Sequence, residues 1–377
     1  MLIGIDASRA NKEQKTGVEW YAYHLIQELK KLTINDGNQW ILYTREPLKE
    51  DLATLPENWF EVRAKWPPKR LWTQVRMSWE MWRRPCDVLF VPAHVLPPIR
   101  PDNSVVTVHD VGFKRMPHLY KQADKSYHDH TTRRIVRTSA RIVTVSEFSA
   151  KELVALYGAK PENIAITHLG IDHNRYRQQE QAGVDEVLLK YHIPKPYFFF
   201  ISRLEAKKNL VNLIKAFDAF KVHRGLGDPT QLVLAGKPGY QYSEIKAQIN
   251  ASKYQDQILE LGYVPEEDVP LLMAGATGYL NLAWYEGFGI PPIQAMACGT
   301  PVIVADNSSM PEVVGQGNGL FVPPDGIDAT ARAMERFVSD PGLVADLQTK
   351  GLQRVKQFTW EMTAKQTLPV LTKWLGA

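Results

Sequence analysis

Short, nearly continuous apolar runs alternate with segments of helical spacing along the whole chain, and this alternation limits the fold more than any other feature. The apolar runs cover residues 2–7, 40–44, 87–92, 105–110, 141–146, 197–202, 231–236, 258–264, 278–283, 302–305 and 319–322. Such runs are typical of parallel strands that are buried on both faces. Between the first two runs, Val18, Tyr21, Ala22, Leu25 and Leu29 recur at helical spacing. The sequence therefore predicts an α/β protein with two doubly wound, Rossmann-like sheets.

The length of 377 residues exceeds what one core usually supports, so two domains are expected. The alternation lapses over the polar residues 168–196, where we expect a linker with a short helix. We predict an N-terminal domain at 1–172, a C-terminal domain at 190–358 and a last amphipathic helix at 360–377. Ligands of doubly wound sheets bind beyond the carboxyl ends of the strands, so the predicted site is the cleft between the two domains.

Composition narrows the class of protein. Hydrophobic residues make up 44% of the chain and charged residues 23%, as in ordinary globular proteins, and the net charge of +4 does not indicate a nucleic-acid binder. Cys86 and Cys298 match no metal-binding spacing, so two reduced thiols are expected. The first residues lack the pattern of a signal peptide, and no run of about 18 apolar residues occurs. We expect a cytoplasmic protein without a resident metal or cofactor.

One acidic residue, Glu286, stands at the end of an apolar run and before a glycine turn. Gly287 and Gly289 allow close backbone approach, and the following prolines suit the first turn of a helix. The start of a helix favours an anion, with Glu286 and Gln294 flanking it. A carboxylate repels phosphate, so Glu286 is expected to face sugar hydroxyls. The alternative is a purely structural turn with a solvated glutamate.

Four other residues, in three segments, strengthen the case for a binding site. Arg203 and Lys208 lie in the segment after a predicted strand, where two cations can hold a diphosphate. Gly17 stands at the start of the first predicted helix, without the glycine spacing of a dinucleotide site. His109 ends another strand, where it can bind hydroxyls, assist proton transfer or simply bond to the backbone.

These segments together resemble the retaining, nucleotide-sugar-dependent glycosyltransferases of family four, which have the GT-B fold. The resemblance covers most of the chain and is strongest in SRLEAKKNL (202–210), LGYV (261–264) and YEGFGIPPIQAMACGTPVIVADNSSMPEVVG (285–315). HDVGF (109–113) and VTVSEFSAKEL (143–153) also look like the N-terminal domain of that family.

The resemblance implies a role for each candidate residue. Arg203 and Lys208 would hold the donor diphosphate, and Glu286 would contact hydroxyls of the transferred sugar. His109 would lie near the reacting sugar, and Gly17 would leave room for the donor phosphate or the acceptor. Backbone groups would meet the sugar, the phosphate and the nucleobase at Phe288, Gly289, Ile290 and Val264. The final helix would return to the N-terminal domain.

One position departs from the family pattern, which places a second glutamate eight residues after the first. Here that position is Gln294, which offers one carbonyl acceptor and adds a donor. We expect a weaker or altered ribose contact, with a loss of about 1–2 kcal/mol in donor affinity.

The expected reaction is transfer of a hexose from a nucleotide-diphosphate sugar to a glycan or lipid-linked acceptor, with retention of configuration. GDP-mannose is favoured as donor over UDP-glucose, and a mannosyltransferase-like member is expected. The cations would replace a divalent metal in stabilising the leaving group. The alternatives are a nucleotide-sugar epimerase or a non-catalytic nucleotide-sugar binder on the same fold.

A basic, tryptophan-rich segment at 66–84 has no place in this scheme. Trp72, Val75, Trp79 and Trp82 fall on roughly one face of an expected helix. We favour packing of this face on the protein's own sheet. Peripheral binding to an anionic membrane and an oligomer contact are the other interpretations, because Trp with Lys and Arg is the chemistry of a membrane interface. The oligomeric state stays open.

Overall fold

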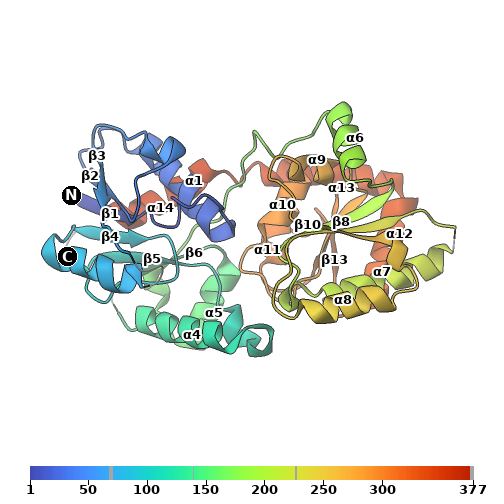
Figure 1. Ribbon diagram of the computed structural model, residues 1–377, viewed down its shortest axis with the longest axis horizontal. Coiled ribbons are helices and arrows are strands. Elements are labelled where there is room, and N and C mark those ends of the chain that lie inside the picture. The colour runs from blue at the N-terminus through green and yellow to red at the C-terminus, as the bar shows by residue number, and fades with distance from the viewer. Residues whose placement is uncertain (68–70, 139, 226, 374–377) are drawn as a thin grey trace. The chain divides into compact units, whose positions relative to one another are not determined.

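The computed structural model describes residues 1–67, 71–138, 140–225 and 227–373. The chain divides into two compact α/β units (Figure 1). The N-terminal unit comprises Met1–Arg115, Gln122–Gly170 and Phe358–Ala377, and the C-terminal unit comprises Met116–Lys121 and Ile171–Gln357. Of the residues that sequence analysis assigned to a linker, 168–170 thus belong to the N-terminal unit and 171–196 to the C-terminal unit. They carry the helix α6 (Gln181–Lys190).

The N-terminal unit holds a parallel seven-stranded sheet in the order β3-β2-β1-β4-β5-β6-β7. Its strands are β1 (Leu2–Asp6), β2 (Gln39–Thr44), β3 (Trp59–Arg63), β4 (Val88–Val91), β5 (Ser104–Val108), β6 (Arg141–Thr144) and β7 (Ile164–Ile166). Its helices are α1 (Gly17–Leu32), η1 (Glu50–Ala53), η2 (Trp72–Met77), α2 (Ser78–Arg83), α3 (Gly112–Arg115), α4 (Gln122–Val136), α5 (Glu147–Tyr157), η4 (Pro161–Asn163) and α14 (Trp360–Thr372). The strand order reverses between β1 and β4.

The C-terminal unit holds a parallel six-stranded sheet in the order β10-β9-β8-β11-β12-β13. Its strands are β8 (Tyr197–Ile201), β9 (Gln231–Ala235), β10 (Ile258–Gly262), β11 (Gly278–Asn281), β12 (Val302–Ala305) and β13 (Leu320–Val322). Besides α6, its helices are η3 (Pro117–Leu119), η5 (Ala206–Lys208), α7 (Leu210–Arg224), α8 (Tyr242–Ala251), η6 (Gln255–Gln257), α9 (Val269–Ala274), α10 (Ile290–Ala297), α11 (Met310–Val314), α12 (Ile327–Ser339) and α13 (Pro341–Val355). The expected pair of doubly wound sheets is confirmed.

Two strands, β3 and β7, were not predicted from the sequence, because they form the edges of the N-terminal sheet. The residues of β3 and β7 are mostly half-buried or exposed, so neither strand has the continuous apolar run of a central strand. Every apolar run named from the sequence corresponds to a strand, with boundaries shifted by a few residues.

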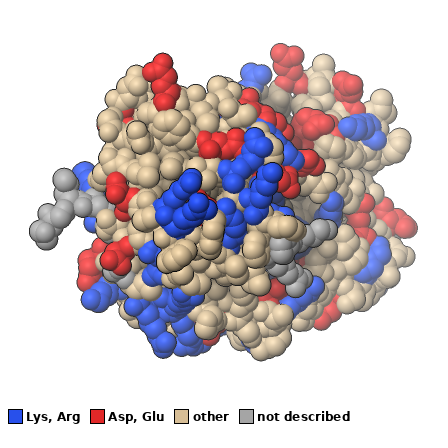
Figure 2. Space-filling view, turned by 60° about the vertical axis from the view of Figure 1, so that its left-hand side comes forward, with Lys and Arg blue, Asp and Glu red and all other residues tan. Residues whose placement is uncertain are grey.

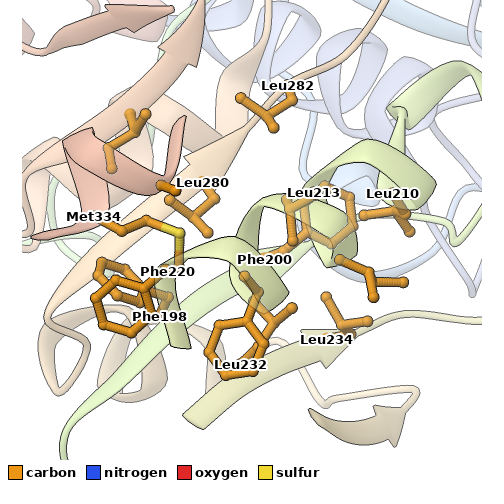
Figure 3. Close-up of a cluster of buried hydrophobic side chains, with 14 of the residues drawn as sticks. Phe198, Phe200, Leu210, Leu213, Phe220, Leu232, Leu234, Leu280, Leu282 and Met334 are labelled. Atoms are coloured by element: carbon orange, nitrogen blue, oxygen red, sulfur yellow. The ribbon is translucent and has the colours of Figure 1, made fainter. Parts of the chain in front are cut away.

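The core of the C-terminal unit shows why its central strands are apolar throughout. Phe198 and Phe200 of β8 point into a cluster that includes Leu232 of β9 and Leu280 of β11 (Figure 3). Helices α7 and α12 close this cluster, with Leu213 among the residues they contribute. On the other side, α10 packs against α9 and α13. Helices thus cover both faces of the strands that carry the predicted donor site.

The last helix packs within the N-terminal unit. In α14, Trp360 stacks on His24 of α1 with ring centroids 4.9 Å apart. A Cβ at Gly170 would lie 2.2 Å from the backbone nitrogen of Trp360, so the chain before the C-terminal unit and the chain after it run in close contact. Residues 374–377 of the predicted helix lie outside the described residues.

The tryptophan-rich segment contradicts the interpretation that its aromatic face packs on the sheet. Trp72 is buried and donates from Nε1 to the carbonyl of Ala64 at 3.0 Å, but Trp79 and Trp82 are 43% and 69% exposed. The buried side chains are instead those of Met77 and Met81 and their neighbours. The physical reason is a π-helical first turn at Trp72–Met77, which shifts the side-chain phase away from the spacing of an α-helix. Residues 68–70 of the segment lie outside the described residues.

Candidate functional site

The predicted donor site lies where the C-terminal sheet reverses its strand order, between β8 and β11. Ligands of open α/β sheets bind at such a point, beyond the carboxyl ends of the strands. The segments that follow these two strands are joined to each other: the amide of Trp284 donates to the carbonyl of Lys207 at 3.0 Å, and Asn209 Nδ2 donates to the carbonyl of Leu282 at 2.9 Å. The two stretches of sequence that carry Lys208 and Glu286 therefore form one structure.

Lys208 and Glu286 meet directly in an ion pair. The Nζ of Lys208 lies 2.5 Å from Oε1 of Glu286, and the two side chains are only 12% and 14% exposed. A charge pair that is largely removed from solvent keeps its position, because separating the partners leaves each one poorly solvated. The cation assigned to the diphosphate and the acid assigned to the sugar are thus held side by side.

Arg203 stands free at the same edge of the sheet. Its side chain is exposed, and its guanidinium forms no hydrogen bond or ion pair with any residue that the structure describes. Its stem is held by packing, since a Cβ at Gly239 would lie 2.7 Å from Cγ of Arg203. A planar guanidinium without a partner is available for bidentate binding of an anion.

Residues 236–239, which follow β9, were not singled out in the sequence. The amide of Leu204 donates to the carbonyl of Lys237 at 3.0 Å, and the amide of Gly239 donates to the carbonyl of Leu204 at 2.8 Å. At Gly236, whose φ is +140°, a Cβ would lie 1.7 Å from the carbonyl oxygen of Ser202. The two glycines after QLVLA were the available signal, because close backbone approach requires a residue without Cβ.

The glycine turn after Glu286 leads into α10 as expected. Gly289 has a φ of +86° at the N-cap, and a Cβ there would clash with the side chain of Met310. Pro291 and Pro292 carry no N–H, so the first turn of α10 presents fewer donors than an ordinary helix start. The amide of Ile290 precedes them. The site thus depends more on the loop and its cations than the sequence pattern indicates.

A second unpredicted segment supports this turn from β12. Ser309 Oγ donates to the carbonyls of Glu286 and Phe288, both at 2.9 Å. Asn307 Nδ2 donates to the carbonyl of Trp284 at 3.0 Å, and the amide of Glu286 donates to Ser308 Oγ at 3.2 Å. In the sequence, the polar residues of ADNSS (305–309) directly after an apolar run were the feature that could have indicated this support of the glycine turn.

Gln294 and Val264 lie differently from the charged residues. The side-chain amide of Gln294 is partly exposed on α10 and makes no hydrogen bond within the described part of the chain. Val264 is buried, so only its backbone is available to a ligand. Beside it, Tyr263 is 61% exposed and carries the ammonium of Lys237 4.7 Å from its ring centroid. Sequence analysis did not select this exposed aromatic ring.

Gly17 and His109 belong to the N-terminal unit. Gly17 begins α1, and a Cβ added there meets nothing within 4 Å. The same first turn holds Glu19, whose carboxylate accepts from Lys12 Nζ at 2.7 Å and from Arg9 Nη1 at 3.0 Å. Burial alone would raise the pKa of Glu19, but hydrogen bonds from Lys12, Thr16 and Arg9 and the charge of Lys12 hold it at about 2. This acid is therefore ionised and holds the segment before Gly17.

His109 follows β5 and faces α1. Its ring meets Tyr21 edge-on, with centroids 4.8 Å apart, and its Nε2 is buried without a hydrogen-bond partner among the described residues. Burial lowers the pKa of His109 to about 4, although the charges of Asp110 and Glu19 oppose the shift. The imidazole is neutral near pH 7 and can exchange one hydrogen bond with a ligand.

In the C-terminal unit, the structure pairs Lys208 with Glu286 next to the glycine turn and places Arg203 after β8, at the same edge of the sheet. In the N-terminal unit, it places Gly17 and His109 near the start of α1. No group of three or more His, Cys, Asp or Glu side chains suited to a metal ion occurs among residues 1–67, 71–138, 140–225 and 227–373. Over the same ranges, no helix is long and apolar enough to cross a membrane.

Comparison with protein families gives two matches. Residues 15–175 match the model of "Glycosyltransferase Family 4", and residues 190–354 match that of "Glycosyl transferases group 1". The O-antigen chain mannosyltransferase B of Escherichia coli is 29% identical over 78% of this chain and 76% of its own. The MMP alpha-(1->4)-mannosyltransferase of Mycolicibacterium hassiacum is 25% identical over 64% of this chain and 56% of its own.

Solved structures show the same fold at low identity. Sucrose-phosphate synthase from Thermosynechococcus elongatus superposes with a TM-score of 0.75 at 18% identity, over 98% of both chains. The lipopolysaccharide glycosyltransferase WaaG gives 0.74 at 14% identity, over 99% of this chain and all of its own. HepE of Anabaena, solved with UDP and glucose, gives 0.73 at 16% identity over 99% of both chains.

Proposed function

Because the chain belongs to the family-four glycosyltransferases of GT-B fold, we propose that it transfers a hexose from a nucleotide-diphosphate sugar with retention of configuration. Mannose is the favoured sugar, with GDP-mannose as donor, since two of the similar proteins are mannosyltransferases by name. UDP-glucose is the second candidate, because HepE was solved with UDP and glucose.

The observation that carries this proposal is the ion pair of Lys208 with Glu286. It lies at the same edge of the sheet as Arg203, whose guanidinium has no partner among the described residues. A donor diphosphate competes with the carboxylate for Lys208 and adds Arg203 as a second cation. Glu286 then accepts hydrogen bonds from hydroxyls of the sugar. Each charged group of the site thus has a partner in the donor, and the ion pair keeps the site in place before the donor binds.

The same groups supply the catalytic effect. As the bond between the sugar and the diphosphate breaks, negative charge grows on the leaving phosphate, and the two cations with the start of α10 stabilise it. This stabilisation takes the place of a divalent metal. The acceptor hydroxyl attacks from the face that the leaving group departs, which retains the configuration. Neutral His109 is assigned a hydrogen bond to the reacting sugar.

The acceptor is a glycan or a lipid-linked saccharide, bound by the N-terminal unit. The exposed Trp79 and Trp82 support a peripheral contact with an anionic membrane surface, because the guanidinium carbons of Arg76 and Arg83 lie 4.6 and 5.3 Å from the Trp79 ring centroid. Sedimentation with anionic vesicles across salt concentrations tests this contact. Binding that survives high salt unchanged would contradict its electrostatic part.

A thermal-shift panel of nucleotide sugars tests the donor, because a ligand that binds only the folded state raises the unfolding midpoint. We expect the largest shift with GDP-mannose. Release of nucleoside diphosphate should require an acceptor. Release without acceptor, or release of no nucleotide at all, would contradict transferase activity and favour a hydrolase, an epimerase or a binder.

Arg203→Ala tests the diphosphate contact. We expect transfer to fall by about 10²–10³-fold, the effect of removing one group that stabilises transition-state charge. Folding should be unaffected, since Arg203 is exposed and unpaired within the described residues. Lys215→Ala, a change of an exposed cation on α7, is the matched control. Unaltered turnover in Arg203→Ala would contradict the proposed contact of Arg203 with the donor diphosphate.

A further inference from the structure

A cavity of about 160 Å³ lies in the N-terminal unit, lined by none of the residues assigned to the donor or to catalysis. Three segments enclose it: η2 through Gln74, the segment after β4 through Leu96 and Arg100, and α4 with the turn after it through Tyr127 and Arg134. An engineered cavity of about 150 Å³ accommodates a benzene molecule. The space therefore suits a phosphoryl group or a short piece of chain, and is too small for a nucleotide.

The interior of the cavity is apolar. Leu96 and Ile135 line it and are only 7% and 2% exposed, and Val95 adds a third aliphatic side chain. An apolar cavity of this size gains from contact with methylene groups, at about 0.8 kcal/mol for each one buried. The interior alone would accept any small apolar molecule.

Two guanidinium groups make the cavity selective for anions. Arg100 and Arg134 both line it, and no carboxylate does. Neither forms an ion pair with any residue in the described ranges, and Arg100 Nη1 donates only to the carbonyls of Pro97 and Pro98, at 3.4 Å each. Burial and the charge of Arg134 lower the pKa of Arg100, although the charge of Asp102 opposes the shift. Two like charges beside one cavity are stabilised by an anion between them.

Exposed apolar side chains stand next to lining residues in the chain, since Val75 follows Gln74 and Ile99 precedes Arg100. Leu71, Val75 and Ile99 are 56%, 46% and 48% exposed, and Tyr127 itself is 44% exposed. The elements form one surface, because Gln74 Nε2 donates to Tyr127 Oη at 2.5 Å and the amide of Ile99 donates to Ser78 Oγ at 3.3 Å. Figure 2 turns the left-hand side of Figure 1 forward and shows groups of Lys and Arg side chains on that face, with Asp and Glu side chains also present. Exposed apolar side chains near the two arginines of the cavity suit a lipid surface.

We propose that this cavity binds the phosphoryl group of a phosphate-linked lipid, with Arg100 and Arg134 on its oxygens and the first carbons of its chain against Leu96 and Ile135. The inference deepens the proposed function, because it gives a lipid-linked acceptor its own anchoring site apart from the transferred sugar. The remaining chain passes over the exposed apolar side chains into the membrane.

Titration calorimetry of the full-length protein with octyl phosphate, below its micelle concentration, tests the site. Inorganic phosphate tests the anion alone, and octyl glucoside tests the chain alone. We expect octyl phosphate to bind at least tenfold more tightly than either. Equal affinity for inorganic phosphate, equal affinity for octyl glucoside, or no binding of octyl phosphate would each overturn the proposal.

Variants locate the binding. Arg134→Gln, at an exposed residue without a partner in the described chain, should weaken octyl phosphate at least tenfold, and Arg100→Gln should do the same. Arg134→Lys should retain part of the affinity. Arg137→Gln, which removes an exposed arginine just beyond α4 that does not line the cavity, is the matched control. Unchanged affinity in Arg134→Gln and Arg100→Gln, or an equal loss in Arg137→Gln, would overturn the assignment.

The cavity assignment and the proposed transferase activity can fail independently of each other. Nucleotide-sugar binding and transfer to a lipid-free acceptor should be unchanged in Arg134→Gln. If octyl phosphate binds as expected but no sugar is transferred to any acceptor, the cavity assignment stands and the proposed function fails. If transfer proceeds and octyl phosphate does not bind, the cavity assignment alone fails.

Discussion

Two glycines that follow strands differ in how closely they are packed. Gly236 lies in the C-terminal unit beside the predicted donor site, and Gly17 lies in the N-terminal unit at a predicted binding position. A Cβ at Gly236 would lie 1.7 Å from a backbone oxygen, whereas a Cβ at Gly17 would meet nothing within 4 Å. The donor segments are thus fixed by close packing of one backbone on another. The start of α1 leaves open space. The segments around Gly236 are closely packed, whereas the start of α1 leaves space beside Gly17.

The largest expected effect comes from breaking the packed half. Gly236→Ala places a methyl group against the Ser202 carbonyl and demands a φ of +140° from alanine. Strain and overpacking together should lower the free energy of unfolding by about 4 kcal/mol. Urea unfolding measures the loss. A loss below about 1 kcal/mol would show that the two segments move apart easily.

Gly17→Ala is the matched change in the open half. Its φ is not positive and the space is empty, so stability should not fall. Sugar transfer should nevertheless decrease if a ligand occupies that space. A variant with both stability and transfer unchanged would remove Gly17 from the site.

The next effect separates stability from activity at the ion pair. Lys208→Met and Glu286→Gln should each lower unfolding free energy by about 1–3 kcal/mol, because each leaves a shielded partner unpaired. The double variant should lose less than the sum of the two. Transfer should fall by about 10²–10³-fold in each single variant and stay low in the double variant, since both groups are assigned to the donor.

Urea unfolding and sugar transfer are measured on the unmodified protein, the two single variants and the double variant. The two series give the interaction between Lys208 and Glu286 in stability and in catalysis. Lys246, whose ammonium pairs with Glu260 in a more exposed position, provides the control as Lys246→Met. If the double variant regained transfer, the pair would be structural only.

A third effect concerns the N-terminal unit and pH. The pKa of His109 is about 4 in the folded protein and about 6.5 in the unfolded chain, so between these values only the unfolded chain takes up the proton. Stability therefore falls as pH is lowered through this window, by about 2 kcal/mol between pH 7.5 and pH 5. His109→Asn should remove this part of the slope.

Urea unfolding at both pH values measures the slope. His118→Asn, at an exposed histidine, should leave the slope unchanged. His94 also has a pKa lowered by burial, to about 3, but it is present in every variant and cancels in the comparison. A slope in His109→Asn equal to that of the unmodified protein would contradict the buried, neutral imidazole.

These comparisons also show what the sequence can predict. The central strands and the Glu286 turn were predictable because burial on both faces and glycine at a close approach leave direct traces in residue type. The orientation of Trp79 and Trp82 was not, because one π-helical turn changes the phase of every later side chain. Sequence spacing also cannot show that Lys208 and Glu286 form a pair, since contact between segments 78 residues apart depends on the strand order.

The smallest effect tests the residue that departs from the family pattern. Gln294 has a partly exposed amide without a partner in the described chain, so Gln294→Glu should leave stability nearly unchanged. A carboxylate accepts stronger hydrogen bonds from a ribose diol than an amide carbonyl does, and donor affinity should rise by about 1–2 kcal/mol. Titration calorimetry with the donor measures the gain, and Gln248→Glu on α8 is the control. Weaker binding in Gln294→Glu would mean that the amide donor itself contributes, and the ribose contact would then differ in kind from that of relatives with glutamate.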